Sequence, residues 1–249
     1  MKTIKAEGRE KAKAAQSGCQ MSETMLMGII LAVSGGFMDA YSYLYRDHVF
    51  ANAQTGNMLL FGINLSRRNF SGAFNYLCPV IAFTLGIVLS DLVRHRLSTG
   101  ERIHWRQFAV LLEAAVLAGV AFIPTAFNLP ANSLTSLACG IQAESFRKIH
   151  GNAAATTMCI GNLRSGTQSL CDCFLTKDKR YIKKSLIYYF IILFFILGAV
   201  LGSVVINYLN GKAVLVCSAI LVTAFFMMFI EGVGKDNGAE ALDALKNRM

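Results

Sequence analysis

The chain has 249 residues, of which 54% are hydrophobic and 16% are charged, and its formal net charge is +9. Soluble domains usually carry about 25% charged residues, so this composition favours a membrane protein over a soluble one. The basic residues are clustered between apolar runs, a pattern that encodes membrane topology rather than a nucleic-acid surface. Seven cysteines without a CxxC pair or a Cys/His ligand spacing predict no disulfide framework and no metal site. We expect no nucleic-acid partner and no cofactor.

The chain starts with a basic, polar tail at residues 1–24, which we expect in the cytoplasm before an uncleaved first span. A polar tail of residues 232–249 follows the last apolar run, also on the cytoplasmic side. Spanning a bilayer takes about 20 apolar residues. Runs of this kind are predicted at 25–45, 70–93, 105–124, 128–146, 184–208 and 212–231.

Two shorter segments, 48–65 and 152–173, separate some of these runs and are polar at their starts. The first contains Gly56-Asn57 and the second contains Gly161-Asn162. Polar backbone broken by glycine is tolerated at membrane depth only where protein or a water-filled cavity surrounds it. Paired breaks in the two halves of a chain are typical of transporter binding sites.

The two halves of the chain are similar in sequence, which predicts two membrane repeats, 25–127 and 128–231, within one membrane domain. Gly56-Asn57 matches Gly161-Asn162 at an offset of 105 residues, and the segment around Gly86 matches that around Gly198 at an offset of 112. Each half has the order span, Gly-Asn segment, span, span. Small offset changes of this kind are expected after duplication with insertions.

The distribution of Lys and Arg bears on whether the Gly-Asn segments cross the bilayer. If both dip in and return, six spans remain, with 20 basic residues inside and 4 outside. If both cross, there are eight spans, with 15 inside and 8 outside. The positive-inside bias is sharper for six, so we predict an all-α polytopic protein with six transmembrane helices and two re-entrant segments. Eight transmembrane helices are the alternative. Three spans per half would make the repeats inverted.

Polar residues at matching depth predict a solute site near the bilayer midplane. Asp39 lies deep in the first span, where a carboxylate needs a partner or a cavity, and Arg164 is a candidate ion-pair partner for it. A half-helix N-terminus beside the Gly-Asn pair would favour an anion. For most of these residues helix capping or packing is an alternative role. The candidate substrate-binding residues are Asp39, Thr55, Gly56, Asn57, Gln142, Thr157, Gly161, Asn162 and Arg164.

Buried or paired acidic residues and two small-residue patterns lead to further predictions. Glu113, in the third span, is a second candidate for proton coupling beside Asp39. Asp91 and Glu144 lie near span ends and are expected to pair with Arg94, Arg147 or Lys148 at the interface. Gly86-x-x-x-Ser90 and Gly198-x-x-x-Gly202 predict tight helix crossing between the halves or, through Gly198 and Gly202, between copies of the chain.

Several motifs resemble one family. Gly-Gly-Phe-Met-Asp-Ala (35–40), Phe-Ala-Asn-Ala-Gln-Thr-Gly-Asn (50–57), Gly-Ile-Gln-Ala (140–143) and Thr157 with Gly161-Asn162-Leu163 are similar to the YoaK-like bacterial membrane proteins, catalogued as domain of unknown function 1275. The similarity covers roughly residues 25–231. This chain departs from the pattern at Ile160, where the family usually has Thr. The resemblance implies a bacterial inner-membrane protein and implies no established activity.

These patterns favour a transporter or channel for a small molecule or ion, in the cell inner membrane with its N-terminus in the cytoplasm. The alternatives are a non-transporting assembly or signalling protein, and a membrane enzyme acting on a lipid or quinone. Since no nucleophile, metal or phosphate-loop pattern is found, we expect no enzymatic activity.

Overall fold

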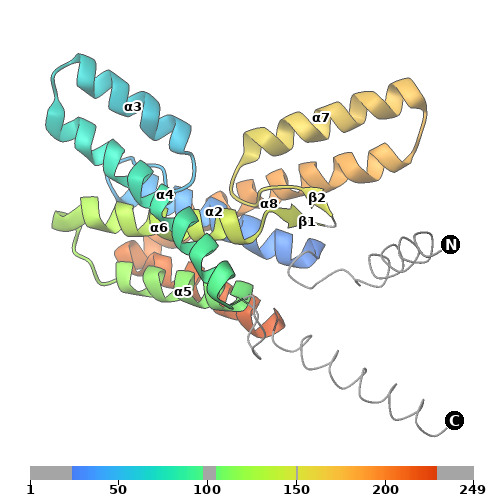
Figure 1. Ribbon diagram of the computed structural model, residues 1–249. Coiled ribbons are helices and arrows are strands. Elements are labelled where there is room, and N and C mark those ends of the chain that lie inside the picture. Colours follow the sequence, from blue (N-terminus) through green and yellow to red (C-terminus); the bar gives the residue numbers. More distant parts are fainter. Residues whose placement is uncertain (1–23, 98–104, 150, 229–249) are drawn as a thin grey trace, which may run out of the picture.

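The structure is a computed structural model that describes residues 24–97, 105–149 and 151–228 (Figure 1). Its helices are α2 (Met25–Tyr45), α3 (Gln54–Ser66), α4 (Phe70–Leu97), α5 (Trp105–Val120), α6 (Asn128–Ser145), α7 (Cys159–Thr176) and α8 (Arg180–Leu209). A last helix runs from 214 to the end of the described residues at 228. Short 3-10 turns, η2 (Thr125–Phe127) and η3 (Asn210–Ala213), precede α6 and that last helix. Apart from Thr24, both predicted tails lie outside the described residues.

The predicted all-α class is confirmed, with one small addition. Strand β1 (Lys148–Ile149) pairs antiparallel with β2 (Asn152–Ala153) directly after α6. Gly151, in the turn between the strands, has a positive φ of 73°, which glycine adopts at no steric cost. The sequence analysis predicted no strand here.

Four long helices pack as two crossing pairs, α2 with α8 and α4 with α6. Both crossings depend on glycine. A Cβ atom at Gly198 would overlap the Val33 carbonyl oxygen of α2, and one at Gly86 would overlap the Leu137 carbonyl oxygen of α6. Small residues permit such close backbone approach. The predicted small-residue patterns therefore join the first half of the chain to the second. Gly202 also packs on α2, so the face suggested for joining copies is covered within the chain.

A hydrophobic core connects α2, α5, α6 and the last helix. Leu31, Phe37, Leu117 and Leu221 are among its fully buried members. The middle of α2 therefore lies inside the molecule, surrounded by helices from both halves of the chain.

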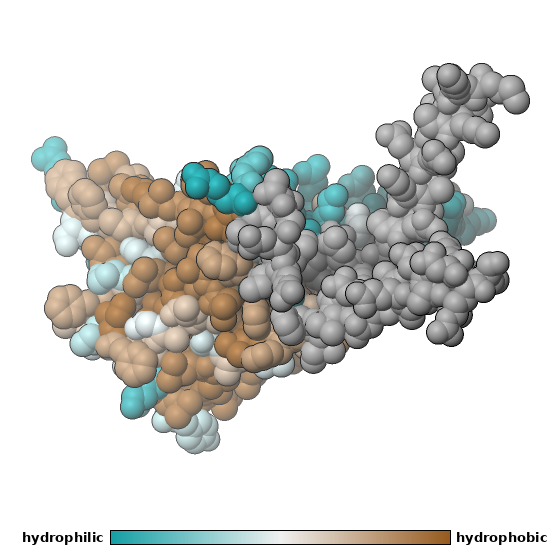
Figure 2. All heavy atoms as spheres, turned by 60° about the horizontal axis from the view of Figure 1, so that its bottom comes forward, coloured by the Kyte–Doolittle hydropathy of each residue, from teal (hydrophilic) through white to brown (hydrophobic). Residues whose placement is uncertain are grey.

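The outer surface is strongly apolar. Three stretches of the described residues are long and apolar enough to cross a membrane: Met25–Tyr45, Phe70–Arg96 and Arg180–Met228. α8 alone exposes a row of large apolar side chains that includes Phe190, Leu197 and Val204. Figure 2 shows a broad hydrophobic face with hydrophilic residues mainly toward its edges. An apolar surface of this extent fits lipid better than water as its solvent.

α3 packs along α4, and α7 packs along α8, so that two helical hairpins project from the bundle on opposite sides of Figure 1. Left-handed residues lie in the connections, Arg68 with φ 57° and Lys177 with φ 58°. Such residues commonly end a helix. Each hairpin contains one of the Gly-Asn segments.

The breaks in the chain lie earlier than the sequence analysis placed them. Gly56 and Gly161 belong to the first turns of α3 and α7, and both helices continue past them. The irregular backbone lies instead at 46–53, which we name the first return loop, and at 146–158, the second return loop, which includes the strands.

Candidate functional site

The first return loop runs back along α2. The Asn52 backbone N–H donates to Asp39 Oδ1 over 2.7 Å, and Asn52 Nδ2 donates to the Gly35 carbonyl over 3.0 Å. Gly35 is the central residue of α2. α3 therefore begins beside the middle of α2 rather than beyond its end.

The second return loop reaches the same turn of α2 from α6. Gln142 Nε2 donates to the Leu31 carbonyl over 2.8 Å and to Thr156 Oγ1 over 3.1 Å. The Thr156 carbonyl oxygen and Thr157 Cγ2 each lie 3.4 Å from the position that a Cβ atom would take at Gly35. The two loops, about a hundred residues apart in the sequence, thus converge on the centre of α2.

The two Gly-Asn asparagines hold these loops by the same device. Asn57 Oδ1 accepts from the Phe50 N–H at 3.0 Å, and Asn57 Nδ2 donates to the Phe50 carbonyl at 2.7 Å. Asn162 makes the same pair of bonds to Ala155, at 3.2 and 2.6 Å. Each amide binds the backbone of the residue seven positions earlier. The amides that the sequence analysis offered to a solute are thus engaged with the chain itself.

Three buried side-chain oxygens have no hydrogen-bond partner in this region: Asn52 Oδ1, Gln142 Oε1 and Thr157 Oγ1. Their residues are at most 3% exposed. Leaving a buried polar atom unpaired costs about 1–3 kcal/mol, so such atoms in a native protein need an explanation. We name Asp39, Asn52, Gln142, Thr156 and Thr157 the central polar cluster.

The cluster draws equivalent atoms from the two loops. Asn52 stands two residues before α3, and Thr157 stands two residues before α7. Both side chains are buried, and both have an unpartnered oxygen. The offset between them is 105, the same as between Asn57 and Asn162. The two matching positions are therefore both polar at the point where the loops meet.

Asp39 brings a carboxylate to the cluster. It is half-buried, and it accepts the Asn52 N–H just before α3, whose N-cap Ala53 has no side-chain hydrogen bond. The amino end of a helix stabilises a negative charge. Asp39 therefore takes the place that the sequence analysis had considered for an anionic solute.

The remaining predicted site residues lie elsewhere. Gly56 packs against the Phe50 ring. Thr55, Gly161 and Arg164 are exposed on α3 and α7, and Arg164 forms no ion pair with Asp39 among the described residues. Of the predicted set, the structure brings together Asp39, Gln142 and Thr157.

Glu113 is a second buried acidic group, on α5. Its side chain is fully buried, and neither carboxylate oxygen has a hydrogen-bond partner. Burying a carboxylate charge without a partner costs far more than burying the neutral acid. Glu113 is therefore suited to hold a proton.

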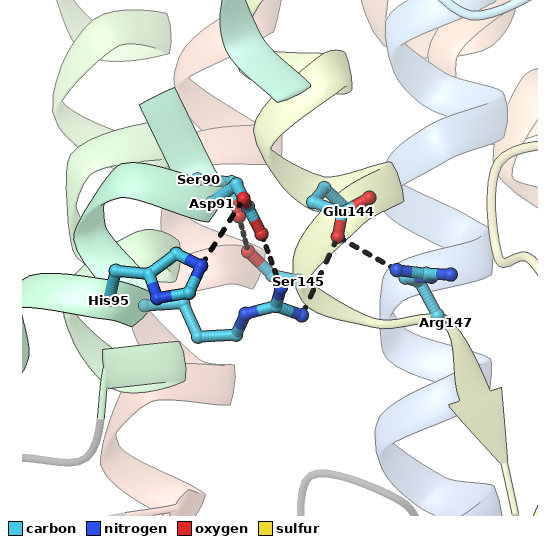
Figure 3. Close-up of polar contacts among 7 residues, drawn as sticks. Ser90, Asp91, His95, Glu144, Ser145 and Arg147 are labelled. Atoms are coloured by element: carbon cyan, nitrogen blue, oxygen red, sulfur yellow. Dashed lines mark hydrogen bonds and ion pairs between the residues drawn. The ribbon is translucent and has the colours of Figure 1, made fainter. Parts of the chain in front are cut away.

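A polar cluster also joins the carboxyl-terminal ends of α4 and α6 (Figure 3). Arg94 pairs with Asp91 and lies 3.8 Å from Glu144, while Arg147 Nη1 lies 3.0 Å from Glu144 Oε1. Beside them, Ser90 and Ser145 share a hydrogen bond of 2.9 Å. The predicted pairing of Asp91 and Glu144 with basic residues is confirmed. The contacts that join α4 to α6 are the Arg94–Glu144 ion pair and the Ser90–Ser145 hydrogen bond.

Sequence reasoning overlooked Asn52, Thr156 and Arg46. Asn52 lies in the motif 50–57, and its equivalence to Thr157 at the 105-residue offset was a signal that could have selected it. Arg46 directly follows the first predicted span, yet it is 1% exposed. Its only signal was its position immediately after an apolar run.

Apolar helices around a buried polar centre define an all-helical integral membrane protein. Residues 27–228 match the model of a family described as "Protein of unknown function (DUF1275)", and the chain belongs to that family. It is 25% identical over 184 residues to the UPF0700 transmembrane protein YoaK of Bacillus subtilis (strain 168), an alignment that covers 69% of this chain and 79% of that protein. No solved structure matches the chain. The family resemblance seen in the motifs is thus confirmed.

Proposed function

We propose that this protein is a transporter or channel for a small molecule or ion, and that the central polar cluster is its binding site. The carrying observation is the set of unpartnered oxygens of Asn52, Gln142 and Thr157, buried where two chain reversals meet. Unwound backbone lining a central site is the arrangement that secondary transporters use to bind solutes. No catalytic step is part of the proposal.

The proposed topology has six membrane crossings and two re-entrant hairpins. α3 has 13 residues, or about 20 Å at 1.5 Å per residue, which is short of the ~30 Å hydrocarbon core. The α3–α4 and α7–α8 connections lie on opposite sides of the bundle in Figure 1, as re-entry from opposite faces requires. The bias of 20 basic residues against 4 favours the same topology, with a cytoplasmic N-terminus in a bacterial inner membrane.

Repeated geometry supports two inverted repeats. The bonds of Asn57 to Phe50 are reproduced by Asn162 and Ala155. The crossing of α2 with α8 at Gly198 corresponds to the crossing of α6 with α4 at Gly86. In each crossing, the first span of one half packs against the second span of the other half. The cluster then lies on the axis that relates the halves.

If transport is coupled to an ion gradient, Asp39 and Glu113 are the proposed proton carriers. Both lie on helices of the hydrophobic core, Asp39 on α2 and Glu113 on α5. Intramembrane carboxyl groups typically serve proton relays.

Flux into proteoliposomes tests the proposal. We expect purified protein to accelerate entry of at least one of four labelled probes, rubidium, methylammonium, phosphate or urea, relative to protein-free liposomes. Asp39→Asn and Gln142→Ala should lower that flux about tenfold, since each removes an oxygen or a charge from the cluster. Gln168→Ala, on the exposed face of α7, is the matched control and should leave it unchanged.

The proposal fails if correctly folded protein gives no flux above empty liposomes for any probe. It also fails if Asp39→Asn and Gln142→Ala, eluting as monodisperse protein, transport as well as the unmodified chain.

A non-transporting assembly or signalling protein is the second candidate. It is favoured by one observation. The side-chain amides of Asn57 and Asn162 form hydrogen bonds to the backbone of the return loops and are not free for a solute. In that case the chain should give no flux in the experiment above while remaining folded in the membrane.

A further inference from the structure

The unpartnered atoms of the central polar cluster all accept hydrogen bonds. Asn52 Nδ2 donates to the Gly35 carbonyl, and Gln142 Nε2 donates to the Leu31 carbonyl. A carbonyl oxygen can only accept, so these bonds fix which end of each amide is nitrogen. The free ends, Asn52 Oδ1 and Gln142 Oε1, are therefore carbonyl oxygens.

The charge of the cluster also favours a ligand that donates hydrogen bonds or carries a positive charge. Asp39 contributes a carboxylate, and it forms no ion pair with a basic side chain in the part of the chain that the structure describes. Arg164, the predicted ion-pair partner of Asp39, is exposed on α7, and Arg46 is bound to the end of α5. Amide oxygens, a hydroxyl and one carboxylate form a ligand set for a hard cation.

The number of charges limits the cation. A single carboxylate balances one positive charge, whereas all-protein sites for divalent ions usually gather several carboxylates. Among the described residues, no group of three His, Cys, Asp or Glu side chains is placed to hold a metal ion. A monovalent ion needs no such group.

We propose that the central polar cluster binds a monovalent cation, either an alkali ion or a protonated amine, through Asp39 and the oxygens of Asn52, Gln142 and Thr157. This inference rests on the site of the proposed function and names the class of solute or coupling ion that the site takes. The bound cation would satisfy all three unpartnered oxygens and bring both return loops onto one ligand.

Thermal unfolding of the purified protein in nanodiscs tests the inference without any transport. The probes are potassium, sodium and methylammonium chloride, compared at equal ionic strength with N-methylglucamine chloride, whose cation is far bulkier than the other three. A ligand that binds the folded state raises the unfolding temperature in a saturable manner. We expect this from at least one small cation and not from N-methylglucamine. A rise in unfolding temperature with potassium or sodium indicates an alkali-ion site, and a rise with methylammonium indicates an amine site.

Thr157→Val is the most discriminating variant. It replaces a hydroxyl that has no partner in the structure with a methyl group of similar size, so the fold should keep its stability without cation. Cation affinity should nevertheless fall about tenfold or more. Asp39→Asn should abolish the cation effect, and Gln168→Ala, on the exposed face of α7, should leave it intact.

Two results would overturn the inference: stabilisation that follows the anion when chloride is exchanged for phosphate, and unchanged cation affinity in folded Thr157→Val and Asp39→Asn protein. Cation-dependent stabilisation without flux would uphold it while removing the transport proposal. Flux of phosphate or urea without cation stabilisation would uphold transport and remove the cation site.

Discussion

Among single side chains, Arg46 is a buried charge that donates five hydrogen bonds within the chain. It donates to the Tyr41 hydroxyl and Asn128 Oδ1, and to the carbonyl oxygens at the end of α5, among them Val120 and Ile123 at 3.2 and 2.8 Å. Its guanidinium lies over the rings of Tyr41 and Tyr45. A cation at the carboxyl end of a helix compensates the partial negative charge there. Arg46 therefore fastens the end of α2 to the end of α5.

Arg46→Met should destabilise the fold by about 3 kcal/mol or more, because it leaves several buried acceptors without a donor. Arg46→Lys should recover only part of this loss, since an ammonium has fewer donors and no planar geometry. Denaturant unfolding in mixed micelles measures both. Arg147→Met, in an exposed ion pair, is the control and should change stability by at most about 1 kcal/mol. Equal effects at both positions would contradict the assigned role.

Among elements, the two glycine crossings determine how the halves fit together. At each crossing the neighbouring atom is backbone: the Val33 carbonyl faces Gly198, and the Phe83 carbonyl faces Gly140. Backbone inside a helix cannot move aside as a flexible side chain can. Helix association in lipid depends on this kind of close packing, since lipid provides little hydrophobic drive between helices.

Gly198→Ala and Gly86→Ala should each destabilise the protein by about 1–3 kcal/mol through overpacking at a backbone contact. Gly119→Ala is a matched control within α5, because no atom lies within 4 Å of the new Cβ position. It should be neutral or stabilising by up to about 1 kcal/mol. Thermal unfolding in nanodiscs separates the two classes. A destabilising Gly119→Ala or a harmless Gly198→Ala would count against the packing described here.

For the whole molecule, the decisive property is the direction in which the hairpins re-enter the bilayer. The first return loop brings Asn52 back to the middle of α2, and α3 then runs to its connection with α4. The second half follows the same course. The second return loop brings Thr156 back to Gln142 of α6, and α7 then runs to its connection with α8. With six crossings, residues 66–69 face the outside and 147–148 face the cytoplasm. With eight crossings, both positions are reversed.

Cysteine labelling in intact cells distinguishes these topologies. In a background whose native cysteines are replaced, Ser66→Cys should react with a membrane-impermeant maleimide, and Lys148→Cys should react only after permeabilisation. Both side chains are exposed in the structure, so access depends on the side of the membrane alone. Lys179→Cys, cytoplasmic in either topology, is the control. The opposite pattern at 66 and 148 would establish eight crossings.

Local patterns were sufficient for the features that depend on neighbours in the sequence. The first span was predicted at 25–45, the bounds of α2, because an apolar run between polar ends is itself the cause of such a helix. The pairing of Asp91 with Arg94 and of Glu144 with Arg147 was predicted because both acidic residues lie near span ends, close to basic residues in the sequence. The Gly-Asn segments were located, and their breaks were misplaced by a few residues.

The chemistry of the centre required the folded chain. A polar side chain is free to bind a ligand only if no internal group satisfies it, and that depends on partners far away in the sequence. Asn57 seemed the better candidate, but Phe50 binds its amide, whereas the oxygen of Asn52 remains unpaired. The composition indicated that lipid surrounds this protein, and the apolar runs indicated its long helices. Tertiary packing decided which buried oxygens have no hydrogen-bond partner, because their partners come from loops that are distant in the sequence and meet only in the folded chain.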